Sequence, residues 1–252
     1  MRTCLSTVHI LLVRDVTMNK NCCSDIKRDK NLSFDITNKG CCGDIRKNKN
    51  LSGDKKDKNL HANERFFDRG ASCYDRRIVQ FWMRKFYQPA MNDIEKNGAV
   101  LDVSCGTGNL LVELASQGHT NLQGVDYSSK MVEAAGQKLS NKAVIQKGDV
   151  HQLPFPDRTF DYVVSTEAFH HYYDQSKALS ELVRVTKKNG KVIVSDINFF
   201  VRPIHWLFQK VEPGCVKINS KTEMRSLFAD AGLTEINQER SFLFALKTVG
   251  VK

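Results

Sequence analysis

Five short runs of β-forming residues alternate with helical stretches from Gly98 onward, and this rhythm constrains the fold more than any other feature of the sequence. The expected strands are Val100–Ser104, Leu122–Asp126, Ala143–Gln146, Tyr162–Ser165 and Lys191–Asp196, and the expected helices are Leu110–Ser116, Ser128–Leu139 and Gln175–Val185. Strands that alternate with helices are typical of a parallel sheet, because each helix returns the chain to the same end of the sheet. The pattern therefore predicts a doubly wound α/β fold.

The flanks of this pattern add further elements. Asn63–Phe67 and then Tyr74–Tyr87 have apolar residues at helical spacing and predict helical structure before the first strand. After Asp196 the alternation stops for about twenty residues. A helix over Ser220–Ala231 and two strand-like runs, Leu233–Gln238 and Ser241–Lys247, complete the chain. Together with the five earlier runs, these predict a sheet of about seven strands.

Residues 1–60 differ in composition from the rest of the chain. Much of this segment is Lys, Asn, Asp and Ser, and residues 22–35 recur as residues 41–54 with 9 of 14 positions identical. Two short copies with few apolar residues offer little surface to bury, so they do not predict a folded repeat. We expect residues 1–60 to be a low-complexity, disordered basic tail and residues 61–252 to be the folded domain.

The charge and hydropathy of the chain exclude some classes of protein. The net charge is +10, but residues 1–60 hold 13 Lys and Arg against 7 acidic residues, and the other residues hold 25 against 21. Because most of the excess lies in the tail, charge alone does not predict a nucleic-acid partner. No stretch approaches the length of about 18 apolar residues that a membrane-spanning helix needs. The sequence therefore predicts no integral membrane contact.

The eight cysteines favour a reducing compartment. Cys22-Cys23 and Cys41-Cys42 are vicinal pairs in the tail, the other four are scattered, and no Cys-x-x-Cys occurs. Thiolates can bind a soft metal, but we interpret the pairs as part of the low-complexity tail and predict no metal site. We expect a cytoplasmic protein. An organelle-targeting sequence is the alternative, because residues 1–14 contain Arg2 and Arg14 and no acidic residue.

The strongest local motif is the segment Val100–Leu110, which reads Val-Leu-Asp-Val-Ser-Cys-Gly-Thr-Gly-Asn-Leu. An apolar strand is followed by a turn with small residues at Ser104, Gly106 and Gly108, and a helix begins at once. Small residues let a ligand approach the backbone, and the N–H groups at the helix start face the ligand. The spacing matches neither the dinucleotide fingerprint nor the phosphate-binding loop.

Acidic residues also end the second and third expected strands. Asp126 lies in Gly-Val-Asp-Tyr-Ser, 18 residues beyond Gly108, and Asp149 follows Gly148. In a doubly wound sheet ligands bind outside the carboxyl ends of the strands, where a carboxylate can accept the hydroxyls of an adenosine ribose. The fourth strand, in Phe160–Thr166, ends at the same edge. Four such signals in order predict a ligand site there.

On these motifs, the chain from about His61 to its end resembles the class I S-adenosylmethionine-dependent methyltransferases, notably the methyltransferase type 11 group. The similar segments are Leu101–Gly108, Gly124–Ser128 with Met131, Gly148–Asp149 with Leu153-Pro154-Phe155, Phe160–Val164, and Lys188–Lys191. The resemblance is specific for fold and cofactor and unspecific for substrate. It implies a Rossmann-like sheet, mostly parallel, with an antiparallel last strand.

The resemblance also implies roles for individual residues toward S-adenosyl-L-methionine. Asp102 and the backbone of residues 104–108 would hold the methionine moiety, and Asp126 would bind the ribose hydroxyls. The other implied contacts are Tyr127 and Met131 on the adenine ring, Asp149 and the Val150 amide at the adenine edge, and Thr166 near the sulfonium. Many members of the family have Gly where this chain has Ser104, and we expect the site to tolerate that small side chain.

The methyl acceptor is expected beyond the fourth strand. His170 and His171 are weak candidates for a general base, since histidine titrates near neutrality. Methyl transfer from a sulfonium can proceed by positioning alone, so we favour a role for the pair in shaping the pocket. Tyr74, His171 and Trp206 are the expected acceptor-pocket residues, and the aromatic segment 199–217 is the expected lid.

Three functions remain compatible with the sequence. The leading hypothesis is a methyltransferase that acts on a small apolar or amphipathic molecule by in-line substitution. The alternative enzyme is a tRNA or RNA methyltransferase, because wobble-uridine enzymes of the superfamily share a His-His after the fourth strand and a basic tail adds phosphate contacts. The domain shows no aromatic-basic surface that would favour RNA. The third hypothesis is a cofactor-binding scaffold without activity. The oligomeric state is not predicted.

Overall fold

A seven-stranded sheet forms the centre of the computed structural model, which describes residues 63–71, 74–212 and 214–252. Its strands are β1 (Val100–Val103), β2 (Leu122–Asp126), β3 (Val144–Lys147), β4 (Phe160–Thr166), β5 (Thr186–Ile197), β6 (Thr234–Phe242) and β7 (Ala245–Val251). The spatial order is β3-β2-β1-β4-β5-β7-β6. Strands β1 to β5 pair in parallel, and β7 pairs antiparallel with β5 and β6. The doubly wound sheet with an antiparallel last strand is confirmed, while the tail expected over residues 1–60 lies outside the described residues.

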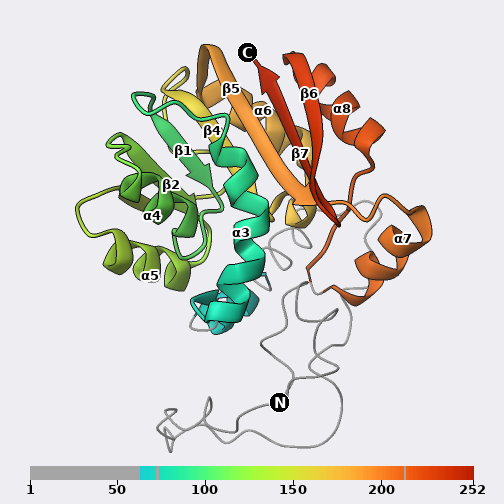
Figure 1. The fold of residues 1–252 in the computed structure, drawn as a ribbon, viewed down its shortest axis with the longest axis horizontal. Coiled ribbons are helices and arrows are strands. Elements are labelled where there is room, and N and C mark those ends of the chain that lie inside the picture. Colours follow the sequence, from blue (N-terminus) through green and yellow to red (C-terminus); the bar gives the residue numbers. More distant parts are fainter. Residues whose placement is uncertain (1–62, 72–73, 213) are drawn as a thin grey trace, which may run out of the picture.

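Helices cover both faces of the sheet (Figure 1). They are α3 (Arg77–Met91), α4 (Asn109–Ser116), α5 (Ser129–Leu139), α6 (Gln175–Val185), α7 (Arg202–Val211) and α8 (Lys221–Asp230), with a 3₁₀ turn η2 (Phe169–His171). Helices α3, α4 and α5 lie on one face, and α6 and α8 lie on the other. Residues 63–71 are also helical. None of the described helices is long and apolar enough to cross a membrane.

The central strands are apolar on both sides, as a sheet covered by helices requires. All four residues of β1 are buried, and so are five of the seven in β4. Phe160, Phe169 and Phe228 are fully buried in the core on the α6 and α8 side. The edge strands β3 and β6 are more exposed. This core holds the carboxyl ends of β1, β2 and β4 at fixed positions along one edge of the sheet.

Two features of the C-terminal part were not predicted. The segment after Asp196 contains α7, where Pro203 lies in the first turn, and proline does not interrupt a helix there. The expected strand Ser241–Lys247 is wrong, because it spans the turn that joins β6 to β7. That turn contains Leu243 and Phe244 and lacks Gly, Asn, Asp or Pro, so nothing in the sequence marked it.

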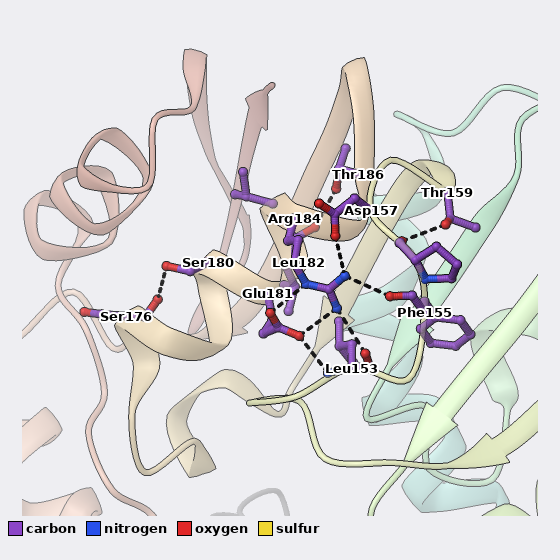
Figure 2. Close-up of polar contacts among 12 residues, drawn as sticks. Leu153, Phe155, Asp157, Thr159, Ser176, Ser180, Glu181, Leu182, Arg184 and Thr186 are labelled. Atoms are coloured by element: carbon purple, nitrogen blue, oxygen red, sulfur yellow. Dashed lines mark hydrogen bonds and ion pairs between the residues drawn. The ribbon is translucent and has the colours of Figure 1, made fainter.

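The loop after β3 is held against α6 by Arg184 (Figure 2). The guanidinium donates to both carboxylate oxygens of Glu181 at 2.7 and 2.9 Å and to Asp157 at 2.7 Å. It also donates to the backbone carbonyls of Leu153 at 3.0 Å and Phe155 at 2.8 Å. Glu181 in turn accepts the Leu153 N–H at 2.8 Å. This cluster fixes the later part of the chain segment between β3 and β4.

Candidate functional site

The turn after β1 has the backbone conformation of a close-approach loop. Ser104, Gly106 and Gly108 have φ values of 59°, 53° and 78°, in the left-handed region. A Cβ built on Gly106 meets nothing within 4 Å, so that side of the turn is open. A Cβ on Gly108 would lie 2.8 Å from Leu139 Cδ1, where α5 packs against the turn. Gly106 therefore leaves space for a ligand, and Gly108 is required by packing. Ser104 adopts the strained conformation without glycine.

Asp126 at the end of β2 organises the neighbouring loops. Its Oδ2 accepts the Gly106 N–H at 2.8 Å, and its Oδ1 accepts the Ser128 N–H at 2.8 Å. Burial raises the pKa of this carboxyl to about 6, although the two backbone donors act in the opposite direction. Each carboxylate oxygen has a second lone pair, so both can accept a further hydroxyl. The residue thus links the β1 and β2 turns and retains acceptor capacity toward a ligand.

Asp102 lies beside Asp126 in the middle of β1. It is 2% exposed, and its Oδ1 has no hydrogen-bond partner among the described residues. Burial, together with the nearby charge of Asp126, raises its pKa well above the ordinary value. A buried carboxylate oxygen without a donor costs free energy that a cationic or N–H-bearing ligand would offset.

The end of β3 contains a pair that the sequence did not suggest. Asp149 Oδ1 accepts the backbone N–H of His151 at 2.9 Å and lies 2.7 Å from its Nδ1. The His151 ring stacks on Tyr173 with centroids 3.6 Å apart. Val150, between the two, is buried. The aromatic stack fixes the imidazole, and the imidazole fixes the carboxylate expected at the adenine edge.

The residues expected to pack on an adenine ring differ in exposure. Tyr127 is half-buried, with Lys147 Nζ 5.4 Å from its ring centroid. Met131 is only 2% exposed, inside the first turns of α5. The helix of residues 63–71 lies over this region, because Asp68 Oδ1 accepts from the Ser128 hydroxyl and, at 3.2 Å, from the Lys130 N–H. This helix closes the loops after β2, which the sequence motifs did not indicate.

A hydroxyl chain joins the ends of β1 and β4. The Tyr172 hydroxyl lies 3.0 Å from Ser104 Oγ and 2.8 Å from Ser165 Oγ. Tyr172 is 5% exposed and Ser165 is fully buried. Thr166, the next residue and the last of β4, is partly buried. Ser104 therefore has a partner that explains its side chain, and Tyr172 is a site residue that sequence reasoning missed.

The two adjacent histidines differ in environment. His170 is fully buried, with its Nδ1 2.6 Å from Asp196 Oδ1 at the end of β5. Burial lowers its pKa, but Asp196 and the nearby acids outweigh burial and raise it to about 9. Burial and the charge of His170 lower the pKa of His171 well below its ordinary value. The pKa values of the two imidazoles are therefore shifted in opposite directions. The His171 ring contacts Phe67 edge-on, with the ring centroids 5.3 Å apart.

Tyr74 and Trp206 lie in different settings. Tyr74 is partly buried near Glu167, Glu212 and Asp126, and burial followed by these carboxylates raises its pKa well above the ordinary value. It therefore lies between the cofactor side and the histidine side. Trp206 is 59% exposed on α7, with Lys210 Nζ 3.4 Å from its ring centroid. The ring contact of Trp206 is therefore with another residue of α7, and its role in the acceptor pocket stays a prediction.

The cluster fits the cofactor that the sequence motifs imply. Open space faces Gly106, a buried oxygen of Asp102 has no partner, and Asp126 keeps acceptor capacity at the same edge. S-adenosylmethionine carries an ammonium, a sulfonium and two ribose hydroxyls, which are the groups that two such carboxylates bind. The donor set is therefore complementary to the ligand.

Comparisons with known proteins agree with this fit. The methyltransferase domain family matches residues 101–194. A demethylmenaquinone methyltransferase from Bacillus licheniformis is 30% identical over 215 residues, which cover 72% of this chain and 90% of that protein. An uncharacterized methyltransferase from Geobacillus sp. strain WCH70 is 33% identical over 137 residues. That alignment covers 53% of this chain and 63%, less than two thirds, of the Geobacillus protein.

Solved structures share the fold at low sequence identity. The methyltransferase in the complex with the Trm112 methyltransferase activator from Haloferax volcanii has a TM-score of 0.65 and 24% identity, covering 73% of this chain and 96% of that one. A methyltransferase from Thermotoga maritima has a TM-score of 0.60 and 22% identity, covering 77% and 99%. At this identity the structures establish the arrangement of the sheet and helices.

Proposed function

We propose, on the premise that the chain belongs to the class I S-adenosylmethionine-dependent methyltransferases, that it transfers a methyl group to a small apolar or amphipathic acceptor. The observation that supports this function best is the pair of carboxylates formed by Asp102 within β1 and Asp126 at the end of β2. Asp126 bridges the Gly106 and Ser128 amides, and the buried Asp102 oxygen beside it lacks a partner in the described part of the chain.

In this proposal the cofactor-binding residues act mainly by positioning. When bound, S-adenosylmethionine supplies a methyl carbon that its sulfonium already activates. Asp102 and the backbone of residues 104–108 hold the methionine moiety, and Asp126 accepts the ribose hydroxyls. Tyr127 and Met131 line the adenine, and Asp149 with the Val150 amide reads its edge.

The acceptor side requires orientation more than proton transfer. Holding the nucleophile in line with a methyl–sulfur bond supplies much of the rate by itself. Thr166, Tyr74 and His171 line this side, and the edge-on contact of His171 with Phe67 makes its wall aromatic. His170 is fully buried against Asp196, so it orders the rim and is not exposed to take a proton from the acceptor.

The aromatic part of this wall favours an acceptor with an aromatic or quinone-like ring. The Bacillus licheniformis relative is named for methylation of demethylmenaquinone. We extend only the chemical class to this chain, a planar ring with an apolar substituent. The segment 199–217 remains our proposal for the lid, and within it the rings of Phe199 and Phe208 pack against each other with centroids 4.8 Å apart and a tilt of 47°.

Calorimetric titration with S-adenosylhomocysteine tests the cofactor site. The full chain and residues 61–252 should both bind at micromolar concentration, and Asp126→Ala should lose binding. Asp230→Asn, at the exposed end of α8, controls for the loss of one negative charge. A folded wild-type chain that does not bind would contradict the enzyme and favour the scaffold.

Transfer of a labelled methyl group tests the acceptor. The chain should label a demethylated quinone or a similar amphipathic ring compound and leave tRNA unlabelled. Labelled tRNA with unlabelled small molecules would replace this acceptor with RNA. Binding of S-adenosylhomocysteine without transfer to any acceptor would leave only the scaffold.

A further inference from the structure

Three potential metal ligands meet just beyond the ends of β4 and α7. His170 and His171 form the end of η2, and Glu212 directly follows α7. One ligand atom of each, two imidazole nitrogens and a carboxylate oxygen, lie within 4.8 Å of one another. The three residues come from segments about 40 positions apart, so the fold and not local sequence brings them together.

The two imidazoles each present a buried nitrogen that lacks a partner. His170 Nε2 and His171 Nδ1 have no hydrogen-bond partner within the described part of the chain, and His170 is fully buried. Leaving a buried polar atom unsatisfied costs free energy. Two such nitrogens on adjacent residues are therefore unusual unless a third species binds both.

The other nitrogen of His170 is already held from outside the cluster. His170 Nδ1 lies 2.6 Å from Asp196 Oδ1. Metal-binding histidines almost always donate their second ring nitrogen to a carboxylate or a backbone carbonyl, which orients the ring and fixes the tautomer. His170 has that support.

The third ligand and the charges are also consistent with a cation. Glu212 is 5% exposed, and its carboxylate lies beside both imidazoles. Glu212 and Asp196 together place two carboxylates in a buried region. One divalent cation would balance the two negative charges. Two imidazoles and one carboxylate form a ligand set that binds Zn²⁺, with a remaining position for water or a ligand oxygen. Tetrahedral Zn²⁺ places its ligand atoms about 3.4 Å apart, which small side-chain rotations from the present separations achieve.

We propose that His170, His171 and Glu212 bind one divalent transition-metal ion, with Zn²⁺ as the best match to these ligands. This site goes beyond the proposed methyl transfer and beyond the sequence-based expectation that the domain has no metal site. It does not depend on that function, because none of the three residues was assigned to the cofactor.

The test measures metal content in the full chain. The tail cysteines are a competing source of ligands, so the measurement uses a background in which Cys22, Cys23, Cys41 and Cys42 are replaced by Ser. After removal of metal with a chelator and addition of Zn²⁺, dialysed protein should retain one Zn²⁺ per chain by elemental analysis. Bound Co²⁺ should show the visible absorption of nitrogen and oxygen ligands without thiolate charge transfer.

Variants assign the ion to the cluster. Glu212→Gln and His171→Ala should lose the stoichiometric Zn²⁺, and Asp196→Asn, which keeps all three ligands, should weaken binding about 10–100-fold. His119→Ala is the matched control, because His119 is also buried with an unpartnered Nδ1 but lies outside the cluster. It should retain the ion.

Two results would overturn the proposal. One is a folded background protein that retains no Zn²⁺. The other is Zn²⁺ retained equally by Glu212→Gln and His171→Ala, which would place the ion elsewhere. Circular dichroism shows which variants fold, and the conservative Glu212→Gln keeps the test valid if His171→Ala does not. Titration with S-adenosylhomocysteine on the same samples separates a missing metal site from a failed methyltransferase assignment.

Discussion

The raised pKa of Asp126 predicts that its negative charge destabilises the ligand-free fold. Burial moves this pKa from 3.8 to about 6, so the folded chain holds the proton more tightly than the unfolded chain. Asp126 therefore contributes stability that is fully present below pH 3.8 and is lost as the pH rises through about 6. A rise of this size corresponds to about 3 kcal/mol, of which about 2 kcal/mol falls between pH 4.5 and pH 7.5.

The variant Asp126→Asn isolates this contribution, because asparagine does not titrate. Urea unfolding of both proteins gives their difference in free energy of unfolding at each pH, and constant effects such as an altered hydrogen bond to Gly106 cancel. Wild type should lose about 2 kcal/mol relative to the variant between pH 4.5 and pH 7.5. A difference that stays flat, or that changes in favour of wild type as the pH rises, would refute the reasoning.

The same titration affects ligand binding in the opposite direction. The ribose hydroxyls need hydrogen-bond acceptors, so they bind best to the ionised carboxylate of Asp126. At low pH the Asp126 carboxyl must therefore lose its proton before it can bind the ribose. With a pKa of about 6, the dissociation constant of S-adenosylhomocysteine for wild type should be about tenfold higher at pH 5 than at pH 7.5. Asp126→Asn should bind weakly at both pH values. An equal affinity of wild type at the two values would show that ionised Asp126 does not hold the ribose.

Three further substitutions test the surrounding structure. Arg184→Ala removes the five donated hydrogen bonds of Figure 2 and should lower the free energy of unfolding in urea by about 2–3 kcal/mol, whereas Lys188→Ala at an exposed position of β5 should change it by less than about 0.5 kcal/mol. Gly108→Ala adds a Cβ at φ 78° and 2.8 Å from Leu139 Cδ1, so thermal unfolding should show a loss of about 2 kcal/mol and calorimetry a weaker affinity for S-adenosylhomocysteine. Tyr172→Phe leaves two serine hydroxyls without their partner and should cost about 1–2 kcal/mol in urea unfolding, with unchanged unfolding cooperativity.

Local sequence patterns predicted the elements whose bounds depend only on the order of apolar and polar residues along the chain. The strands β1, β2 and β4 are short apolar runs ended by polar residues, so their bounds and their shared edge followed from the sequence. Asp126 was predicted as a site residue because it ends an apolar strand, and Asp102 was predicted through the resemblance to the methyltransferase family. Gly108 was predicted as a turn residue, but its contact with Leu139 needed the packing of α5.

Contacts between distant segments could not be predicted in this way. Tyr172 joins Ser104 and Ser165 across two strand ends, and its own neighbours in sequence give no sign of that role. Glu212 is an ordinary residue at the end of an amphipathic helix until the fold places it beside His170. Such side chains become site residues only through tertiary structure, because the sequence around them has no local feature that distinguishes them from other residues.

The acidic residues of the site explain why the fold keeps a costly arrangement. Asp102 and Asp126 each have a raised pKa, chiefly through burial, and the charge of Asp126 adds to the effect on Asp102. Packed apolar side chains at these two positions would give a more stable ligand-free protein. Binding of a ligand with two positive groups and two hydroxyls makes these carboxylates stabilising. The ligand supplies the positive charge and the hydrogen-bond donors that the carboxylates lack in the ligand-free chain. The same groups that weaken the ligand-free chain above pH 6 therefore make its stability depend on the cofactor, and S-adenosylmethionine should raise the unfolding temperature of wild type far more than that of Asp126→Asn.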